Sequence, residues 1–485
     1  MSGSLTSSLP SVGRPADQIL AELRAMRGGD LPTHGGRTLA YVYDSGLTGV
    51  DELAAAAHAL ASSANGLDPT AFPSLLRMEN DIVAAAAGLL GGGPTTVGSV
   101  TSGGTESCML AVHAARAAHP DLDRPKIVLA STAHAAFHKA AHYFGVEAVT
   151  VPVVPDTYVA DPAAMAEAID DRTVLVVVSA PSYAHGVIDP VPKVAAAAAA
   201  RGVRCHVDAC IGGWVLPYFR ALGAPVPDFD LSVPGVTSLS VDLHKYAYCP
   251  KGTSVLLHAD PELRRTQFFA SAAWPGYTML NSTLQSTRSG GPLAAAWAVL
   301  NHLGDEGYRA LAADTLAATR ALRAGITAIE GLHILGDPTS TLLATTASSG
   351  DFDVFTVADE MTARGWYVQP QFGFESSPAN LHMTVTASNR GSEDALLAAL
   401  GESVEAARDS GPVVLAPELV SAIATLDPSS LTSEQFGGLL ALAGLEGDGT
   451  PQRMAEINSM LAAAPPPLRE RLLVEFLGVL YTPQR

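Results

Sequence analysis

The sequence predicts an α/β fold with a mostly parallel β-sheet covered by helices on both faces. Short runs rich in Val, Ile and Leu recur along the chain with the length of buried strands, at residues 126–130, 148–152, 173–179, 203–207 and 238–241. Ala-rich stretches of helical length separate most of these runs. This alternation is typical of parallel sheets, because each crossover between parallel strands needs a long connection that is usually a helix.

Length and composition describe a compact, acidic protein. The chain has 485 residues, of which 48% are hydrophobic and 16% are charged, and this predicts one large domain with one or two smaller ones. The net charge of −19 argues against nucleic acid or an anionic membrane as a general partner, since either needs a basic surface. No run of about 18 apolar residues occurs, so we expect no membrane span.

The N-terminus and the cysteines favour a cytoplasmic protein. The first residues lack the basic segment and apolar segment of a secretory signal. The cysteines include no Cys-x2-Cys pair and no histidine cluster at zinc-finger spacing, so we expect buried free thiols in a reducing compartment. These cysteines are Cys108, Cys205, Cys210 and Cys249.

Changes in pattern divide the chain into four expected parts. Residues 1–60 form an N-terminal arm, with a short helix and a Gly-rich turn before Tyr43. Residues 61–310 carry the helix–strand alternation of the large domain, and residues 311–410 form a small C-terminal α+β domain. Residues 411–485 are a helical C-terminal extension.

A Gly-rich turn leads into a helical pattern that begins near Cys108. The segment Thr101-Ser-Gly-Gly-Thr-Glu-Ser107 offers a backbone that can approach an anion closely, with small hydroxyl groups and the first amides of a helix to bind phosphate. It matches neither a P-loop nor a dinucleotide fingerprint. An ordinary N-capped turn is the alternative interpretation.

Two later segments place an acid and a lysine directly after apolar strands. Asp208 lies in His206-Val-Asp-Ala-Cys-Ile-Gly-Gly213, at the carboxyl end of a strand, where ligand sites of parallel sheets lie. A carboxylate there can hold a proton on a pyridine nitrogen. Lys245, in Asp242-Leu-His-Lys-Tyr246, is a candidate for a Schiff base, which needs a sheltered, partly desolvated amine. The alternatives are a helix-capping aspartate and a solvated surface lysine.

The order of these segments is more specific than each segment alone. A phosphate turn, then Asp208, then Lys245 37 residues later is the order found in pyridoxal-phosphate (PLP) enzymes of the aspartate-aminotransferase fold. The chain resembles the sphingosine-1-phosphate lyases, within the group II PLP-dependent decarboxylase family, over about residues 40–410. The stretches that carry the resemblance are Phe72-Pro-Ser-Leu-Leu-Arg-Met-Glu79, Val100-Thr-Ser-Gly-Gly-Thr-Glu-Ser107, Ala133-His-Ala-Ala-Phe-His-Lys-Ala-Ala-His-Tyr-Phe-Gly145, His185-Gly-Val-Ile-Asp-Pro-Val-Pro192, His206-Val-Asp-Ala-Cys-Ile-Gly-Gly213, Asp242-Leu-His-Lys-Tyr246, Pro250-Lys-Gly252 and Arg288-Ser-Gly-Gly291.

This resemblance implies fold type I of the PLP-dependent transferases, with a mostly parallel seven-stranded sheet in the large domain. It implies that Lys245 is catalytic and carries the cofactor, that Asp208 pairs with the pyridine nitrogen, and that His134 stacks on the ring. The Gly-rich turn and His244 are implied to hold the cofactor phosphate. The full implied cofactor set is Ser102, Gly103, Gly104, Thr105, His134, Asp208, His244, Lys245, Arg288 and Gly290.

The catalytic residues on the substrate side of this family correspond to Tyr43, Tyr183 and Lys251. A phenol can relay a proton, and an ammonium can hold an anionic head group, so Tyr43 and Lys251 are also expected to bind substrate. One position departs from the family: its Asn-Pro-Leu-His stretch, whose His helps bind the substrate phosphate, is replaced here by Asn65-Gly-Leu-Asp68. A carboxylate at Asp68 would repel a substrate phosphate, so whether the substrate is phosphorylated stays open.

Three histidines follow one another at a spacing of four residues. His134, His138 and His142 would share one helix face and could ligate a metal. No carboxylate joins them, and no His-Glu-x-x-His motif occurs. We therefore expect one stacking histidine, two packing ones, and no metal.

The predicted reaction is retro-aldol cleavage of a long-chain 2-amino-3-hydroxy compound, which releases an aldehyde and an amine such as phosphoethanolamine. PLP weakens whichever bond stands perpendicular to its ring, so a substrate carboxylate in that place would make the enzyme an L-amino-acid decarboxylase. A non-catalytic PLP-fold binding protein is a third interpretation, which the intact Lys245 and Asp208 disfavour. We expect a small-molecule amine substrate and a homodimer with shared active sites, because the Arg288–Gly291 loop and the arm carrying Tyr43 resemble parts that cross the interface in this family.

Overall fold

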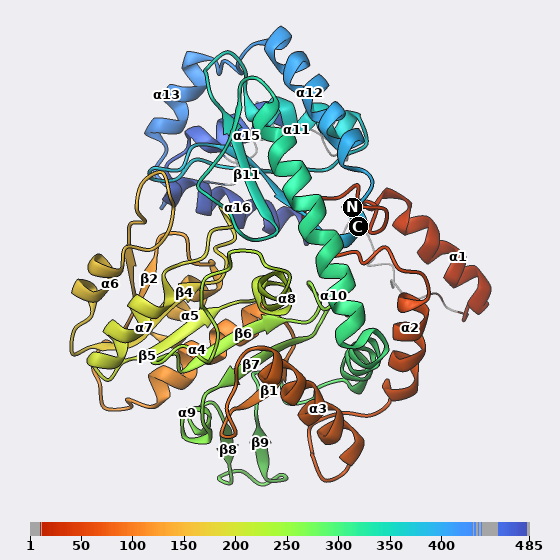
Figure 1. Cartoon of the computed structure of the whole chain (residues 1–485), viewed down its shortest axis with the longest axis vertical. Coiled ribbons are helices and arrows are strands. Elements are labelled where there is room, and N and C mark those ends of the chain that lie inside the picture. Colours follow the sequence, from red (N-terminus) through yellow and green to blue (C-terminus); the bar gives the residue numbers. More distant parts are fainter. Residues whose placement is uncertain are drawn as a thin grey trace, which may run out of the picture.

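The structure is a computed structural model that describes residues 10, 12–429, 431–432, 435, 438 and 454–482. Its centre is a seven-stranded sheet in the order β1-β7-β6-β5-β4-β2-β3 (Figure 1). Only the two pairings made by β7 are antiparallel, so the prediction of a mostly parallel seven-stranded sheet is confirmed. The strands are β1 (Val97–Thr101), β2 (Lys126–Ala130), β3 (Glu147–Val151), β4 (Thr173–Ser179), β5 (Arg204–Asp208), β6 (Ser238–Asp242) and β7 (Ser254–His258).

Helices cover both faces of this sheet, as the continuous apolar strands predicted. In β2, Ile127 and Leu129 pack into a cluster with α4 (Gly104–Ala117) and α5 (Ala136–Phe144). The alternate residue Val128 packs on the other side, in the core that contains α7 (Val191–Ala200). Successive side chains of a strand point to opposite faces, so a strand that is apolar throughout is buried on both faces.

The remaining helices of this part surround the sheet and its edges. They are α2 (Val50–Ala61), α3 (Pro73–Leu89), α6 (Pro162–Ala168), α8 (Leu216–Ala221) and α9 (Pro261–Arg265), with short 3-10 turns at Gly212–Trp214 and Arg27–Gly29. A two-stranded hairpin of β8 (Phe269–Ser271) and β9 (Met279–Asn281) extends from it. The long helix α10 (Gly290–Ala328) bends at Gly304, where φ is +57°, and runs on to the second sheet (Figure 1).

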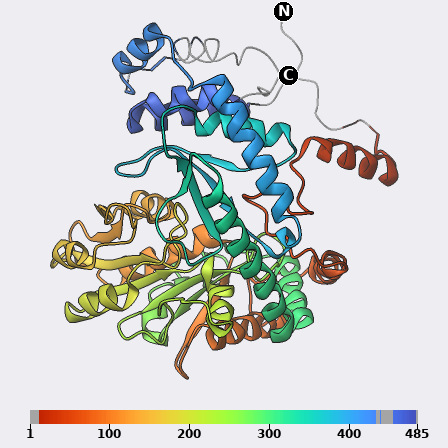
Figure 2. The same ribbon diagram turned by 45° about the horizontal axis from the view of Figure 1, so that its top comes forward.

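The second sheet is antiparallel and has the order β10-β11-β13-β12. Its elements are β10 (Leu332–Ile334), β11 (Leu342–Ala347), α11 (Val354–Ala363), β12 (Gln369–Gln371), β13 (Asn380–Thr384), a 3-10 turn at Ala387–Asn389 and α12 (Glu393–Ser410). The N-terminal arm joins this part, because the fully buried Leu39 belongs to its hydrophobic core. The backbone of Leu39 also bonds to Tyr367 and Thr384. By contrast, α1 (Ala16–Met26) has no buried residue and stands away from the rest of the chain (Figure 2).

The described part of the C-terminal extension is helical, with α13 (Pro417–Thr425), α15 (Ala455–Ala463) and α16 (Pro466–Leu480). Ile423, Met460 and Leu468 form a small core of their own. Thr432 and Gln435 exchange the two hydrogen bonds of a capping box. None of the helices in the described ranges has the length and hydrophobicity that a membrane crossing requires. The four-part division of the chain stays a prediction.

Candidate PLP site

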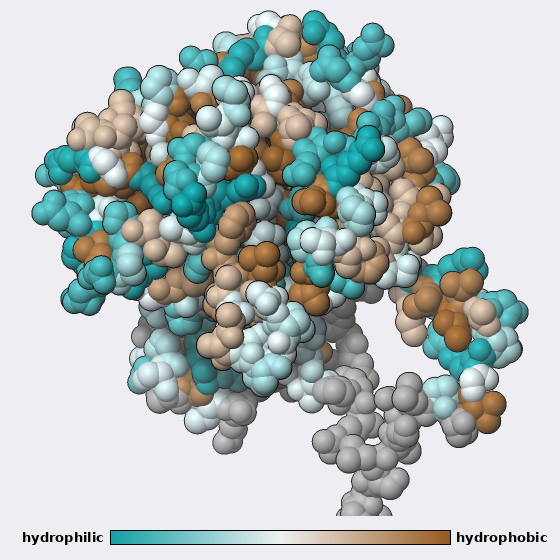
Figure 3. All heavy atoms as spheres, turned by 90° about the horizontal axis from the view of Figure 1, so that it is seen from below, coloured by the Kyte–Doolittle hydropathy of each residue, from teal (hydrophilic) through white to brown (hydrophobic). Residues whose placement is uncertain are grey.

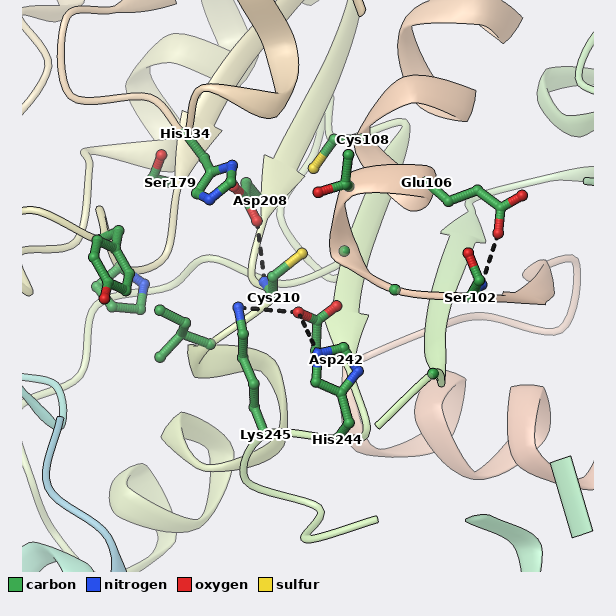
Figure 4. A pocket seen from close by; sticks show the side chains of 17 residues that line it. Ser102, Glu106, Cys108, His134, Ser179, Asp208, Cys210, Asp242, His244 and Lys245 are labelled. Carbon is green, nitrogen blue, oxygen red and sulfur yellow. Dashed lines mark hydrogen bonds and ion pairs between the residues drawn. The ribbon is translucent and has the colours of Figure 1, made fainter. Parts of the chain in front are cut away.

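Four strands of the large sheet end at one cavity of about 430 Å³. Ser102 follows β1, Ser179 ends β4, Asp208 ends β5 and Asp242 ends β6. Eight of the ten predicted cofactor residues line this cavity, together with Tyr183 (Figure 4). The eight are Ser102, Gly103, Gly104, Thr105, His134, Asp208, His244 and Lys245.

The Gly-rich turn comes close to the β6 side of the cavity. A Cβ atom at Gly104 would lie 2.7 Å from Oδ2 of Asp242 and 2.9 Å from Sγ of Cys210, so this position has room only for glycine. The buried Glu106 fastens the turn, because its carboxylate accepts hydrogen bonds from the amides of Ser102 (2.6 Å) and Leu284 (2.9 Å). The helix α4 begins here, and the first amides of a helix suit a phosphate group.

Asp208 and His134 are oriented by hydrogen bonds within the chain. Oδ1 of the buried Asp208 accepts a hydrogen bond from the amide of Cys210 at 3.1 Å. Nδ1 of His134 accepts the amide proton of Ala136 at 3.1 Å, so a neutral His134 carries its proton on Nε2. Both side chains line the cavity from different elements (Figure 4).

Lys245 forms an ion pair that the sequence analysis did not foresee. Its ammonium lies 2.9 Å from Oδ2 of Asp242, three residues earlier. Burial favours the uncharged amine, but the charge of Asp242, with smaller effects of Tyr43 and Cys210, raises the pKa of Lys245 well above its ordinary value. The amine is therefore desolvated, as expected of a lysine that forms a Schiff base, while its ion pair with Asp242 favours the charged form. Asp242 is itself buried, and its Oδ1 has no hydrogen-bond partner.

His244 lies between Lys245 and the Gly-rich turn. Its Nδ1 lies 2.8 Å from the carbonyl oxygen of Thr253 and must donate, because a carbonyl cannot. Its Nε2 lies 3.7 Å from Oδ2 of Asp242. Burial lowers the pKa of His244. A Cβ atom on Gly103 would lie 3.7 Å from the ring, so His244 adjoins the turn that is predicted to hold phosphate.

Tyr43 and Lys251 lie in an adjoining cavity of about 400 Å³ that shares His244 with the first. The ammonium of Lys251 lies 5.0 Å from the centre of the Tyr43 ring and donates a hydrogen bond to the carbonyl of Tyr41 at 2.9 Å. Burial of this ammonium, reinforced by the charge of Lys245, lowers the pKa of Lys251 to about 8. Burial raises the pKa of Tyr43, although Lys245 opposes this effect.

Two predicted cofactor residues are not brought into the cavity of their own chain. The guanidinium of Arg288 bonds to Oε2 of Glu79 at 2.8 Å and to the carbonyl of Val100 at 3.0 Å. Gly290 begins α10 in a packed place, where a Cβ atom would lie 2.7 Å from the carbonyl oxygen of Ala61. Within this chain both residues make packing or polar contacts outside the cavity, and their roles toward the cofactor stay predictions.

Asp68, the residue that departs from the family, is exposed and engaged locally. Its carboxylate accepts hydrogen bonds from the hydroxyl of Thr70 at 2.6 Å and from its amide at 2.8 Å, and these bonds lower the pKa of Asp68. The nearby Gly66 donates its amide proton to the carbonyl of Arg288 at 2.8 Å. The Asp68 stretch and the Arg288 loop are thus fastened to each other.

The three spaced histidines do not gather. His134 precedes α5, while His138 and His142 lie on its exposed face, so the expectation that these two pack into the core is wrong. Among the described residues, one group has the geometry for a metal ion, and it consists of Cys108, Asp208 and Cys210. Asp242 was not among the predicted site residues, although its spacing of three residues from Lys245 was a signal.

A family model described as "Pyridoxal-dependent decarboxylase conserved domain" matches residues 33–346. A second model, for the C-terminal HTH domain of pyridoxal-dependent enzymes, matches residues 417–479. The rice sphingosine-1-phosphate lyase is 35% identical over 84% of this chain and 76% of its own length. The chain belongs to the sphingosine-1-phosphate lyase family of pyridoxal-dependent enzymes. The corresponding lyase of Dictyostelium discoideum is 39% identical, and here the chain spans 66% of the relative's length, just under two thirds.

Solved structures place this lyase-family chain in the same fold. The sphingosine-1-phosphate lyase of Burkholderia pseudomallei matches with a TM-score of 0.78 and 38% identity, over 83% of this chain and 93% of that protein. A glutamate decarboxylase of Lactobacillus brevis shares the fold at 19% identity, with a TM-score of 0.73 over 84% of this chain and 96% of that protein. Fold type I is therefore confirmed, and the decarboxylase shows only the fold.

PLP is the cofactor of this family, and the cavity fits it. Asp208 presents a carboxylate that a pyridinium nitrogen can pair with, and Lys245 presents the amine. Gly104 leaves room for a close approach of a phosphate beside the N-terminus of α4. These observations agree with a phosphate-bearing ring in the cavity.

Proposed function

We propose that this chain is a PLP-dependent aldehyde-lyase that cleaves a long-chain 2-amino-3-hydroxy compound, in its phosphorylated form, to an aldehyde and an amine such as phosphoethanolamine. The observation that carries the substrate class is the cavity of Lys251 and Tyr43 beside the cofactor cavity. The ammonium of Lys251 can bind an anionic head group of the substrate. Relatives named sphingosine-1-phosphate lyases, such as the rice protein, support the same proposal.

Bound PLP supplies an electron sink for the bond that breaks. Asp208 would hold the protonated ring nitrogen, because a buried carboxylate stabilises a neighbouring positive charge. His134, which lines the same cavity, would stack on the ring. In the cleavage, the 3-hydroxyl gives up its proton, the Cα–Cβ bond breaks to release the aldehyde, and a proton is added at Cα.

The proton transfers need groups near Lys245, and the charge of Lys245 acts on both predicted phenols. Tyr183 donates its own proton to Gln369, so it acts as an acceptor toward the cavity. The ring of Tyr43 lies 5.0 Å from the ammonium of Lys251. We propose that Tyr43 and Lys245 exchange the protons of the 3-hydroxyl and of Cα.

The experiment that tests this function is product analysis with the PLP-loaded protein. Four compounds are compared: a phosphorylated long-chain amino alcohol, its unphosphorylated form, an L-amino acid, and a phosphorylated amine without the 3-hydroxyl. Aldehyde release that is fastest from the phosphorylated amino alcohol supports the proposal. CO2 release from the amino acid would show that the enzyme is a decarboxylase instead. If none of the four compounds is turned over, a non-catalytic binding protein is favoured.

The role of Lys245 is tested by substitution, with Lys251 as the rival because its pKa of about 8 leaves more free amine near neutral pH. Lys245→Ala should abolish the near-visible absorbance of lysine-bound PLP and its fixation by borohydride. The exposed Lys193→Ala serves as the matched control and should retain both. Borohydride fixation at Lys251 in the wild-type protein would overturn the assignment.

We also propose a cytoplasmic homodimer in which the Arg288 loop and the Asp68 stretch serve the partner's cavity. Support comes from exposed apolar side chains on the β8–β9 hairpin and α1, among them Phe269, Tyr277 and Leu20. Figure 3 shows the molecule from below, with hydrophobic side chains on this lower face. More of them lie on the separate lobe at the right, on the side where α1 stands in Figure 1. The four described cysteines are free and buried, which is compatible with a reducing compartment.

Subunit mixing tests shared sites directly. Arg288→Ala and Lys245→Ala should each be inactive alone, whereas random mixing regenerates one intact site in each hybrid dimer, or about a quarter of wild-type activity. No recovery after mixing, with hybrid dimers present by mass, would show that each chain completes its own site. Cell fractionation with the full chain tests the compartment.

A further inference from the structure

We infer that Cys108, Asp208 and Cys210 form a site for a thiophilic divalent cation, such as Cd²⁺ or Zn²⁺, whose occupation excludes PLP. One ligand atom from each residue lies within 4.8 Å of the others. Cys108 belongs to α4, and the other two residues lie at the end of β5. Figure 4 shows the three side chains side by side in the cofactor cavity.

The ligand types select the cation. Zinc and its heavier relatives accept both thiolate and carboxylate ligands, with bonds of about 2.3 Å to sulfur and about 2.0–2.2 Å to oxygen, and soft thiolates favour them over magnesium or calcium. Ligand atoms of a tetrahedral site lie ~3.3–3.8 Å apart, so small rotations of these side chains close the present spacing. All three residues line the cavity, which leaves a fourth position open to solvent.

Without a cation, the two thiols stay protonated. The thiol of Cys210 donates a hydrogen bond to the hydroxyl oxygen of Ser240 at 3.2 Å. The adjacent Cys108 thiol, burial and the carboxylates of Asp208 and Asp242 raise the pKa of Cys210 well above its ordinary value. For Cys108 the adjacent Cys210 favours the thiolate, but burial and the carboxylates outweigh it and the pKa of Cys108 is raised. One cation that binds displaces two thiol protons, and its two positive charges offset two of the three negative charges on the ligands.

Exclusion of PLP follows from the shared carboxylate and the shared cavity. A cation on Asp208 neutralises the charge that would pair with the pyridine nitrogen, and it lies in the cavity that the ring would fill. This part of the inference rests on the proposed role of Asp208, whereas the cation site itself rests only on the three side chains. A competitor at 100 times its dissociation constant should weaken the apparent affinity for PLP about 100-fold.

Cd²⁺ is the probe, because thiolate bonding to it produces an ultraviolet charge-transfer band. The full chain freed of PLP should bind one equivalent, with release of two protons, and the affinity should rise about 100-fold per pH unit. Cys108→Ser and Cys210→Ser should each lose the band. Cys249→Ser is the matched control, since Cys249 is equally buried and lies outside the group.

The ultraviolet band tests the cation site, and the rate of PLP uptake tests exclusion of the cofactor. Absence of the band at one equivalent, or its persistence in both variants, overturns the cation site. If the band forms but Cd²⁺-saturated protein takes up PLP as fast as the free protein, exclusion is overturned. Should a variant fail to fold, the competition between Cd²⁺ and PLP on the wild-type chain still decides the outcome, and a chelator should restore PLP uptake.

Discussion

The hydroxyl of Tyr183 donates a hydrogen bond to Oε1 of Gln369 at 2.6 Å. Gln369 lies on β12 of the small sheet, and its Nε2 donates in turn to the hydroxyl of Tyr41 at 2.9 Å. One carboxamide thus joins the cavity wall to the N-terminal arm. The ring of Tyr183 is also stacked on His382, with 4.3 Å between the ring centres, so its position depends on the small sheet.

Replacement of Gln369 by Met removes both bonds without changing the side-chain length. We expect kcat to fall about 2- to 10-fold, the equivalent of one or two hydrogen bonds. In the Tyr183→Phe background the same change should have little further effect, because Gln369 acts through that hydroxyl. The two substitutions are compared in a double-mutant cycle of kcat and KM. If Gln369→Met lowers kcat by the same factor with Tyr183 present and with Phe at that position, Gln369 acts through another group.

Asp208→Asn should leave PLP bound but remove the charge that keeps the ring nitrogen protonated. We expect a loss of at least ~100-fold in kcat, comparable to the loss of a strong electrostatic contact. Absorbance of the bound cofactor checks occupancy, and product formation checks turnover. Near-normal turnover would mean that another group protonates the ring.

Asp242→Asn should lower the pKa of Lys245, because the carboxylate is what raises it. Lys245 bonds to PLP through its neutral amine, so uptake of PLP accelerates as pH rises toward the pKa. The midpoint of this rate profile should therefore move to lower pH in the variant. An unchanged midpoint would indicate that Asp242 contributes little to the charge of Lys245.

Lys251 should make the binding of a phosphorylated substrate depend on pH. Its pKa of about 8 means that the ammonium is charged below that pH and loses its charge above it. KM for the phosphorylated compound should rise between about pH 7 and about pH 9, whereas phosphate itself keeps its charge there, since its second pKa is about 6. The unphosphorylated compound is the control, and Lys251→Met should flatten the profile. An unchanged profile in that variant would place the head group elsewhere.

Asp68→His should shift preference toward the phosphorylated compound. The change removes a repulsive charge and supplies a side chain that is cationic at lower pH. Because Asp68 is exposed and bonded to Thr70, we expect a gain of about fivefold in relative kcat/KM, larger at about pH 6.5 than at about pH 8. Thr70→Val, which removes only the hydroxyl partner, is the control. No gain at either pH would mean that this stretch does not meet the head group.

The large sheet was predictable because its strands are apolar on both faces, as Val128 and its neighbours show. β1 and β7 were not recognised, since Gly98 and Ser99 interrupt the apolar run of β1, and β7 begins with Ser254 and ends with His258. The cofactor cavity followed from local motifs that each lie within a few residues of a strand end.

Contacts between distant segments escaped the sequence analysis. Arg288 was assigned to the cofactor, but its guanidinium is bonded to Glu79, 209 residues away. Gln369 lies 186 residues from Tyr183, and no periodicity or motif announces such a pair. Long-range pairs of this kind depend on how distant elements pack together, which local patterns do not encode.

Leu39 is synthesised long before the residues that bury it. This residue is fully buried in the core around the antiparallel sheet, and Thr384 donates its amide proton to the Leu39 carbonyl. Its partners leave the ribosome about 300 residues after it does, and closing so long a loop is slow. The nascent arm therefore waits with an exposed apolar segment while the large sheet forms, and chaperone binding to nascent chains should concentrate there until β13 emerges.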